Sequence, residues 1–221
     1  MTTCGRCIRR GVEALLLLGL ALASVAGAQQ GTALEGQALV NALRAGGYNI
    51  YFRHAATDWS LDDHVSKEGD WVSCDSGKMR QLAAEGRRQA QLIGEAMRAL
   101  RIPVGRVLAS PYCRTVETAR LMELGSIETT TDVMNLRAAG YFGGREAVAE
   151  RARKRLSIAP AKNSNTVLVA HGNVVRAATG EYPGEAGAVI FRPESDGNPS
   201  VIAHITPQEW IRLAAEFAHR R

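Results

Sequence analysis

The segment that most constrains the fold is an unbroken apolar run, TVLVA at residues 166–170, which is followed at once by His171 and Gly172. A short run without alternating polar residues is typical of a strand that is buried on both of its faces. A strand is covered on both faces where helices pack above and below a sheet. The run therefore predicts an α/β architecture.

The rest of the chain alternates between helical and strand-like patterns. The Ser110-Pro111 pair predicts a helix whose N-cap is Ser110 and whose first residue is Pro111. The pattern as a whole predicts a three-layer α/β/α sandwich with a mostly parallel central sheet. The expected helices are 32–45, 82–100, one from 111, 145–156, one from 172, and one behind a capping box at 206–209; the expected strands are 48–53, 106–109, 127–131, 166–170, 188–191 and 201–205.

Residues 1–28 have the pattern of a secretory signal peptide. Three arginines precede an apolar run, and the small residues Ala26, Gly27 and Ala28 follow it. We expect cleavage after Ala28, which would leave residues 29–221 as a single exported domain in the periplasm or outside the cell. The alternative is that the segment is retained as an anchor, in which case the protein would be held at the membrane.

The charge of the chain argues against a nucleic-acid-binding protein. The formal net charge of +5 falls to +3 without the leader, because the leader contains three arginines and one glutamate. The remaining basic residues form no dense stripe of the kind that binds phosphate backbones.

Cysteine usage fits export. Cys4 and Cys7 form a CxxC motif, but both lie in the leader. Cys74 and Cys113 remain, and an oxidising compartment favours a disulfide between them, with two separate thiols as the alternative. Such a bridge would attach the far end of the long polar stretch 55–81 beside the third predicted helix. We expect this stretch to be an ordered lid that contributes to substrate selectivity.

Cationic and titratable side chains follow three of the predicted strands. Arg53 and His54 follow the segment NIYF, Arg114 lies shortly after the strand at 106–109, and His171 ends the run at 166–170. In open α/β sheets, ligands bind at the carboxyl ends of the strands. We therefore expect these four residues to converge in one crevice.

The four residues have no acidic residue next to them in the sequence, and clustering cations without an anion is costly in a cleft of low dielectric. A phosphoryl ligand would supply the missing charge, because arginine forks match phosphate oxygens and helix N-termini add N–H donors. Taken alone, His171 reads as a structural histidine and Arg53 as a surface residue. A structural reading must account for all three strand ends together.

The segments FRHAATD, ASPYCRTVETA and VAHGNVVR together resemble the histidine phosphatase superfamily, also called the phosphoglycerate mutase-like or acid phosphatase family. Within it, the chain is most similar to a small bacterial branch with an Arg-His-Ala motif. The resemblance spans roughly residues 48–191. It implies a phosphoglycerate mutase-like fold and hydrolysis of phosphomonoesters without a metal or other cofactor.

The resemblance also implies roles for individual residues. His54 would be the nucleophile that forms a phosphohistidine, which water then hydrolyses. Arg53, Arg114 and His171 would bind the phosphoryl group and stabilise charge in the transition state. A neutral imidazole whose second nitrogen is held by a carbonyl is a competent nucleophile near neutral pH.

The chain departs from the family at the acid that protonates the leaving group. The segment VMNLRA at 133–138 contains no acid, and Gly172 takes the position directly after the late histidine. Of the remaining acids, Asp58 is our prediction, because it lies nearest to the nucleophile in sequence; the others are Asp62, Asp63 and Glu185. Without an acid, the enzyme would be slow or restricted to good leaving groups, such as phosphoramidates and acyl phosphates.

The sequence thus predicts an exported phosphatase, monomeric or weakly dimeric, that acts on a small phosphorylated substrate such as an envelope sugar phosphate or a nutrient ester. A non-catalytic phosphate-binding module that has lost its acid is the main alternative. Retention of His54 argues against it, because binding an anion requires no nucleophile. A mutase ranks third, since it would need a phosphorylated cofactor.

Overall fold

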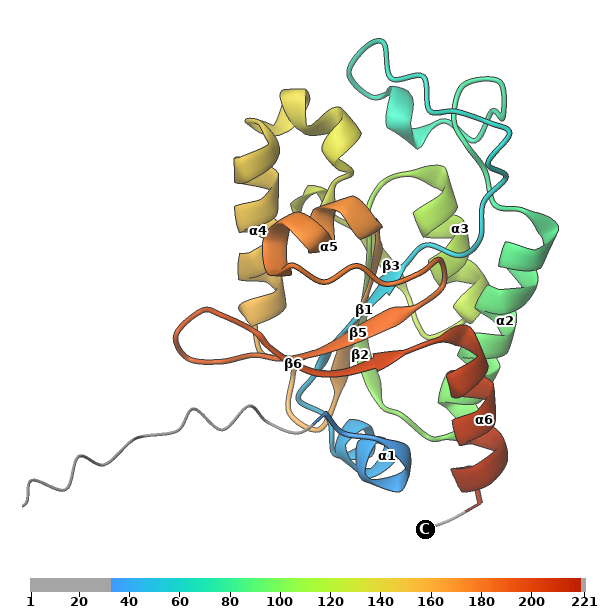
Figure 1. The fold of residues 1–221 in the computed structure, drawn as a ribbon, viewed down its shortest axis with the longest axis vertical. Coiled ribbons are helices and arrows are strands. Elements are labelled where there is room, and N and C mark those ends of the chain that lie inside the picture. Colours follow the sequence, from blue (N-terminus) through green and yellow to red (C-terminus); the bar gives the residue numbers. More distant parts are fainter. Residues whose placement is uncertain (1–32, 220–221) are drawn as a thin grey trace, which may run out of the picture. The chain divides into compact units, whose positions relative to one another are not determined.

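A six-stranded sheet organises residues 33–219, which are the residues that the computed structural model describes (Figure 1). The predicted signal peptide and its cleavage site lie outside the described residues. In the described part of the chain, no helix has the length and apolar character needed to cross a membrane.

The sheet is mostly parallel, as predicted. Its strand order is β3-β2-β4-β1-β5-β6. The pairings β1 with β4, β4 with β2, and β2 with β3 are parallel, whereas β5 pairs antiparallel with both β1 and β6. The strands are β1 (Asn49–Arg53), β2 (Val104–Ala109), β3 (Ile127–Thr129), β4 (Asn165–Ala170), β5 (Ala188–Arg192) and β6 (Ser200–Ile205).

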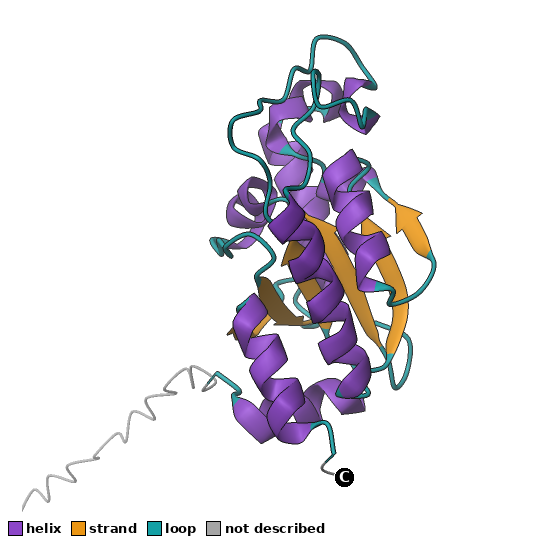
Figure 2. Ribbon diagram, turned by 90° about the vertical axis from the view of Figure 1, so that its right-hand side faces the viewer, coloured by secondary structure: helices purple, strands orange, loops and turns teal. Residues whose placement is uncertain are grey.

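Helices cover both faces of this sheet, which gives the predicted three layers (Figures 1 and 2). One core lies between the sheet and α1, α2, α3 and α6; the other lies between the sheet and α4, α5 and the short 3₁₀ helices. The α-helices are α1 (Gly36–Ala45), α2 (Ala84–Ala99), α3 (Cys113–Met122), α4 (Arg145–Ser157), α5 (Gly172–Thr179) and α6 (Pro207–Phe217); the 3₁₀ helices are Asp70–Val72, Thr131–Val133 and Leu136–Phe142.

Strand β4 shows why its sequence is apolar throughout. Val167 and Val169 point into one core, and Leu168 and Ala170 point into the other. Successive side chains of a strand alternate between its faces, so a strand with helices on both sides needs apolar residues at every position.

The start of α3 differs from the prediction. The helix begins at Cys113, with Tyr112 at the N-cap, rather than with Ser110 as cap and Pro111 as first residue. Ser110 still belongs to the sheet, because its N–H donates to the carbonyl of Val169 at 3.0 Å. Sheet pairing and the extended backbone of Tyr112 therefore delay the helix, and the hydroxyl of Ser110 is left to contact the site described below. The predicted capping box of α6 is confirmed.

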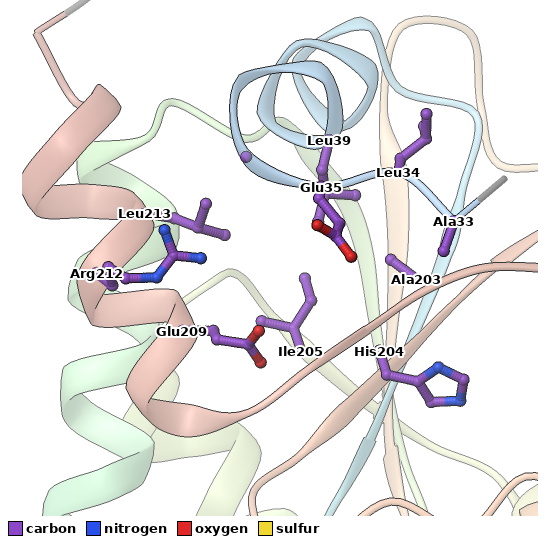
Figure 3. Close-up of a pocket in the computed structure, with 11 residues that line it drawn as sticks. Ala33, Leu34, Glu35, Leu39, Ala203, His204, Ile205, Glu209, Arg212 and Leu213 are labelled. Carbon is purple, nitrogen blue, oxygen red and sulfur yellow. The ribbon is translucent and has the colours of Figure 1, made fainter.

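A hollow of about 250 Å³ lies between α1, β6 and α6 (Figure 3). Two of its polar side chains are engaged in local structure. Glu209 accepts hydrogen bonds from the N–H and hydroxyl of Thr206 in the capping box, and His204 contacts Glu181 at 2.6 Å.

Candidate active site

A cleft of about 140 Å³ opens at the carboxyl ends of the parallel strands. Strands β2, β4 and β1 are neighbours in the sheet, so their ends meet at one edge. The residues that follow them therefore come together although they are far apart in sequence. The lining residues are Arg53, His54, Trp59, Arg80, Asn135, Arg137, His171, Gly172, Asn173 and Tyr182.

His54 is held by backbone contacts on both sides. Its backbone N–H donates to the carbonyl of Ala170 at 2.9 Å, and its backbone carbonyl accepts from the N–H of Ala186 at 3.0 Å. The ring nitrogen Nδ1 lies 2.9 Å from the carbonyl oxygen of Ala55. A carbonyl only accepts, so Nδ1 carries the proton and Nε2 keeps its lone pair at the cleft that His54 lines.

The environment of His54 keeps its imidazole neutral. The side chain is buried, with an exposed fraction of 3% for the residue. Burial, followed by the positive charge of Arg114, lowers the pKa of His54 well below its ordinary value of 6.5. The ring is therefore a potential nucleophile over the whole neutral range.

His171 lies beside His54, with ring centroids 5.6 Å apart. Its Nε2 is 2.9 Å from the hydroxyl of Ser110, and its buried Nδ1 has no hydrogen-bond partner. The hydroxyl of Tyr51 fixes the backbone of His171 by donating to its carbonyl and accepting from its N–H. Burial, with Arg114 next, lowers the pKa of His171 well below 6.5, so this ring is neutral as well.

Arg114 is paired with Asp63, which the sequence suggested only as a possible proton donor and not as a counter-ion. Its Nη1 and Nη2 donate to Oδ1 and Oδ2 of Asp63 at 2.9 and 3.0 Å. The two side chains are only 1% and 2% exposed. The expectation of a cluster without a counter-ion is therefore wrong for Arg114. The partner comes from the 55–81 loop, 51 positions away. The buried Nε of Arg114 remains without a partner.

Arg53 is only loosely neutralised. Its Nη2 lies 3.7 Å from Oε1 of Glu185, and its Nη1 donates to the carbonyl of Pro183 at 3.4 Å. The guanidinium lies over the ring of Tyr182, 5.3 Å from the centroid. Most of its hydrogen-bonding capacity therefore remains open to a ligand in the cleft.

Sequence reasoning missed several residues of the cleft. Arg80 lies with its guanidinium 3.9 Å from the ring centroid of Trp59. Asn173 donates to the side chain of Asn135 at 2.9 Å. Asn135 could have been identified from the sequence, because it lies in the segment VMNLRA at 133–138, where the family has an acid. Arg80 had no such signal, because it ends a loop without periodicity.

The structure gives no support to Asp58 as the acid. Asp58 is exposed, and its carboxylate accepts hydrogen bonds from the hydroxyl and N–H of Ser60. These bonds lower its pKa, which favours the ionised form. Glu185 accepts hydrogen bonds from the side chains of Thr57 and Trp59, and it is not one of the residues that line the cleft. Among residues 33–219, no carboxyl group lines the cleft.

The predicted disulfide between Cys74 and Cys113 is present. It connects the 55–81 loop to the first residue of α3, directly before Arg114. The base of the loop is closed by a bridge between Thr57 and Leu82. The loop is thus attached at its base and near its far end, and it borders the cleft through Trp59 and Arg80.

Part of the chain matches a known protein family. Residues 50–138 match the family model of the histidine phosphatase superfamily, branch 1. Residues 50–138 thus have the sequence pattern of the histidine phosphatase superfamily. This match supports a phosphatase-type hydrolase as the coarse assignment. The matched region begins in β1 and ends in the 3₁₀ helix Leu136–Phe142, so it contains two of the three strand ends at the cleft.

Two solved structures are similar to this chain at low sequence identity. The Mycobacterium tuberculosis protein of open reading frame Rv3214 aligns with 73% of this chain and 98% of its own, at a TM-score of 0.50 and 18% identity. The protein histidine phosphatase SixA in complex with tungstate aligns with 73% of this chain and 97% of its own, at a TM-score of 0.47 and 17% identity.

A curated relative is an agropine synthesis reductase of Rhizobium rhizogenes, 31% identical over 147 residues, which is 58% of this chain and 33% of that protein. The chain spans about a third of the length of the curated relatives it matches.

Proposed function

We propose that this histidine phosphatase is an exported enzyme that hydrolyses phosphomonoesters and related phosphoryl compounds through a phosphohistidine on His54. The observation that supports this most is the state of the His54 ring. Its Nδ1 proton is committed to the carbonyl of Ala55, and its Nε2 lone pair is available at a cleft that arginines line. A module that only binds phosphate has no use for such a nucleophile.

In the proposed reaction, Nε2 of His54 attacks phosphorus, and the bond from phosphorus to the leaving group breaks, with its electron pair going to the leaving group. Water then attacks the phosphohistidine, the P–N bond breaks, and orthophosphate leaves while a proton of the water passes to solvent. Arg53 and His171 line the cleft and bind the phosphoryl oxygens, and Arg114, which is paired with Asp63, contributes its positive charge from behind them. The guanidinium charges supply the neutralisation that a metal ion supplies in other phosphoryl-transfer enzymes, so the proposed activity needs no added metal.

The lining of the cleft supports a restricted set of substrates. Because no carboxyl group of residues 33–219 lines the cleft, a leaving group that must be protonated by the enzyme would depart slowly. Phosphoramidates, acyl phosphates and aryl phosphates have leaving groups that need less help. We propose that these react faster than alkyl phosphates. Small phosphorylated compounds outside the cytoplasm, sugar phosphates among them, remain the proposed physiological class.

The test is turnover of p-nitrophenyl phosphate and acetyl phosphate by the full chain in the presence of a chelator. His54→Ala should abolish turnover, whereas His219→Ala, which removes an exposed histidine at the end of the chain, should retain it. Acid-labile and base-stable labelling of the wild type, lost in His54→Ala, would identify the phosphohistidine. Full activity in His54→Ala would refute the proposal.

The alternative is a phosphate-binding module, favoured because no carboxyl group in the described part of the chain lines the cleft. It predicts saturable phosphate binding without turnover of either activated substrate. Export is a separate proposal. Its test is the N-terminal sequence of the protein recovered from the periplasm, which should begin at Gln29.

A further inference from the structure

Arg80 is a buried cation without an anionic partner. The residue is 9% exposed and lines the same cleft as His54. Its Nε is buried and makes no hydrogen bond. Within residues 33–219, no carboxylate lies within 4.0 Å of its guanidinium, in contrast to Arg53 and Arg114. A buried charge of this kind is costly unless a ligand compensates it.

The acid that is nearest along the loop does not serve this purpose. Asp63 directs both carboxylate oxygens to the guanidinium of Arg114, and it receives only the backbone N–H of Arg80, at 3.1 Å. Asp63 therefore neutralises Arg114 and occupies its two terminal nitrogens. The side chain of Arg80 keeps its donors, and Asp63 and Glu185 act on its charge only from beyond ion-pair distance.

The position of Arg80 is fixed by its surroundings. Its carbonyl accepts from Nη1 of Arg114 at 3.4 Å, and its N–H is the one bound to Asp63. The neighbouring Met79 is fully buried, and the guanidinium stacks on the ring of Trp59. An arginine whose backbone and planar group are both held loses little entropy when it binds a ligand.

We propose that Arg80 is a further catalytic residue, which contacts the transferring phosphoryl group directly. This inference rests on the proposed function. With the terminal nitrogens of Arg114 occupied by Asp63, Arg80 supplies a full guanidinium charge to the oxygens of the phosphoryl group. That charge matters more here than in a site with an acid, because the enzyme then depends on charge stabilisation around phosphorus.

The experiment compares Arg80→Ala, Arg80→Gln and Arg80→Lys with Arg88→Ala, which removes an exposed arginine on the neighbouring helix α2. We expect Arg80→Ala and Arg80→Gln to lower kcat/KM for acetyl phosphate on the order of 10²- to 10³-fold, as the loss of one preorganised donor does elsewhere. Arg80→Lys should recover part of the loss, and Arg88→Ala should match the wild type. The thermal midpoint without phosphate should fall little, because the guanidinium forms no ion pair within residues 33–219 and the contact removed is its stacking on Trp59.

Binding of orthophosphate, measured by calorimetry, separates the two proposals. It should weaken at least tenfold in Arg80→Gln. If the wild type turns over substrate and the Arg80 variants stay within threefold in kcat/KM, the role of Arg80 is refuted while the phosphatase stands. If the wild type shows no turnover, the proposed function fails, and weakened phosphate binding in Arg80→Gln would still support the contact. Unchanged phosphate binding would refute it.

Discussion

Two neighbouring imidazoles, His54 and His171, are buried beside Arg114 of α3. Burial and the nearby guanidinium both oppose a positive charge on the rings, which is why their pKa values lie well below 6.5. The chemical consequence is that His54, the proposed nucleophile, stays unprotonated in mildly acidic solution. The energetic consequence is that the folded state resists taking up protons that the unfolded state binds readily.

This difference predicts how stability depends on pH. The unfolded chain binds protons at both histidines as the pH falls through about 6.5, and the folded protein does not. Above pH 6.5 both states leave the two rings neutral, and stability is unaffected. Below pH 6.5 the free energy of unfolding falls by about 1.4 kcal/mol per pH unit for each histidine. Urea unfolding at pH 7.5 and 5.5 should show this loss. In His54→Asn/His171→Asn the loss should be smaller; an equal loss in the variant would contradict the assignment.

The pair between Asp63 and Arg114 makes a second prediction. Removing one partner of a buried ion pair leaves an uncompensated charge, which typically costs about 3–5 kcal/mol. Asp63→Ala should therefore lower the free energy of unfolding by about that amount, measured by urea titration at pH 7.5. The neighbouring Asp62 is exposed, so Asp62→Ala is the matched control and should be nearly neutral. Equal effects of the two changes would rule out a stabilising role for the pair.

The sequence predicts some residues of the site and not others. Arg53, His54 and His171 are found because each follows a strand, and the end of a strand is a position that sequence patterns reveal. Asp63 and Arg80 lie in a loop, where position depends on tertiary contacts such as the hydrogen bond from Arg80 to Asp63. Loop segments carry no periodic signal, so their contribution to a site becomes visible only in three dimensions.

Among the elements, the 55–81 loop depends most on covalent structure. A bridge with a sequence separation of 39 residues stabilises by about 4 kcal/mol in the chain-entropy account. The bridge also holds the loop that provides Asp63 and Arg80. Loss of the bridge should therefore affect both stability and catalysis.

We expect the variant Cys74→Ser/Cys113→Ser to unfold with a free energy lower by about 4 kcal/mol than the oxidised wild type. Its activity on acetyl phosphate should also fall, at a temperature where circular dichroism shows that it remains folded. Treating the variant with a reductant should change nothing further, whereas the wild type should lose activity under the same treatment. A folded variant with wild-type activity would mean that the loop holds its place without the bridge.

The start of α3 shows where element prediction from sequence is limited. Ser-Pro is a good local signal for a helix start. The sheet competes for the same residue, however, and the hydrogen bond from Ser110 to Val169 shows that it wins. Local capping preferences are worth about 1 kcal/mol, and a tertiary contact overrides them readily. The apolar pattern of β4 is a stronger predictor, because two cores require it.

At the scale of the molecule, the cleft has more cations than acids. Arg53, Arg80 and Arg137 line it, Arg114 lies behind it, and the two acids closest to them are Asp63 and Glu185. A dianion bound there would stabilise the folded state over the unfolded one by mass action.

Orthophosphate should therefore raise the melting temperature relative to chloride at the same ionic strength. At a hundred times the dissociation constant, the gain is about 2.7 kcal/mol. Differential scanning fluorimetry would measure the shift, and Arg53→Ala should reduce it. Equal melting temperatures in the two salts would show that the cleft does not bind phosphate.

The layered architecture follows from the sequence because it depends on patterns repeated in every element. The apolar run of β4, the periodicity of the helices and the order of strands and helices all favour the same three-layer fold. Which carboxyl groups of residues 33–219 reach the cleft does not follow, because a single carboxyl group leaves no repeated pattern.

His54 has its N–H bound to Ala170 and its carbonyl bound by Ala186, whereas the loop above it is attached through Cys74 and closed by a few contacts at its base. The backbone of the proposed nucleophile is thus held independently of the loop, although the loop also supplies Asp63 and Arg80. Changes at the other loop positions, such as Trp59, can alter what enters the cleft while His54 keeps its geometry. Such a protein can acquire new substrates over evolutionary time as long as the loop keeps these two residues in place.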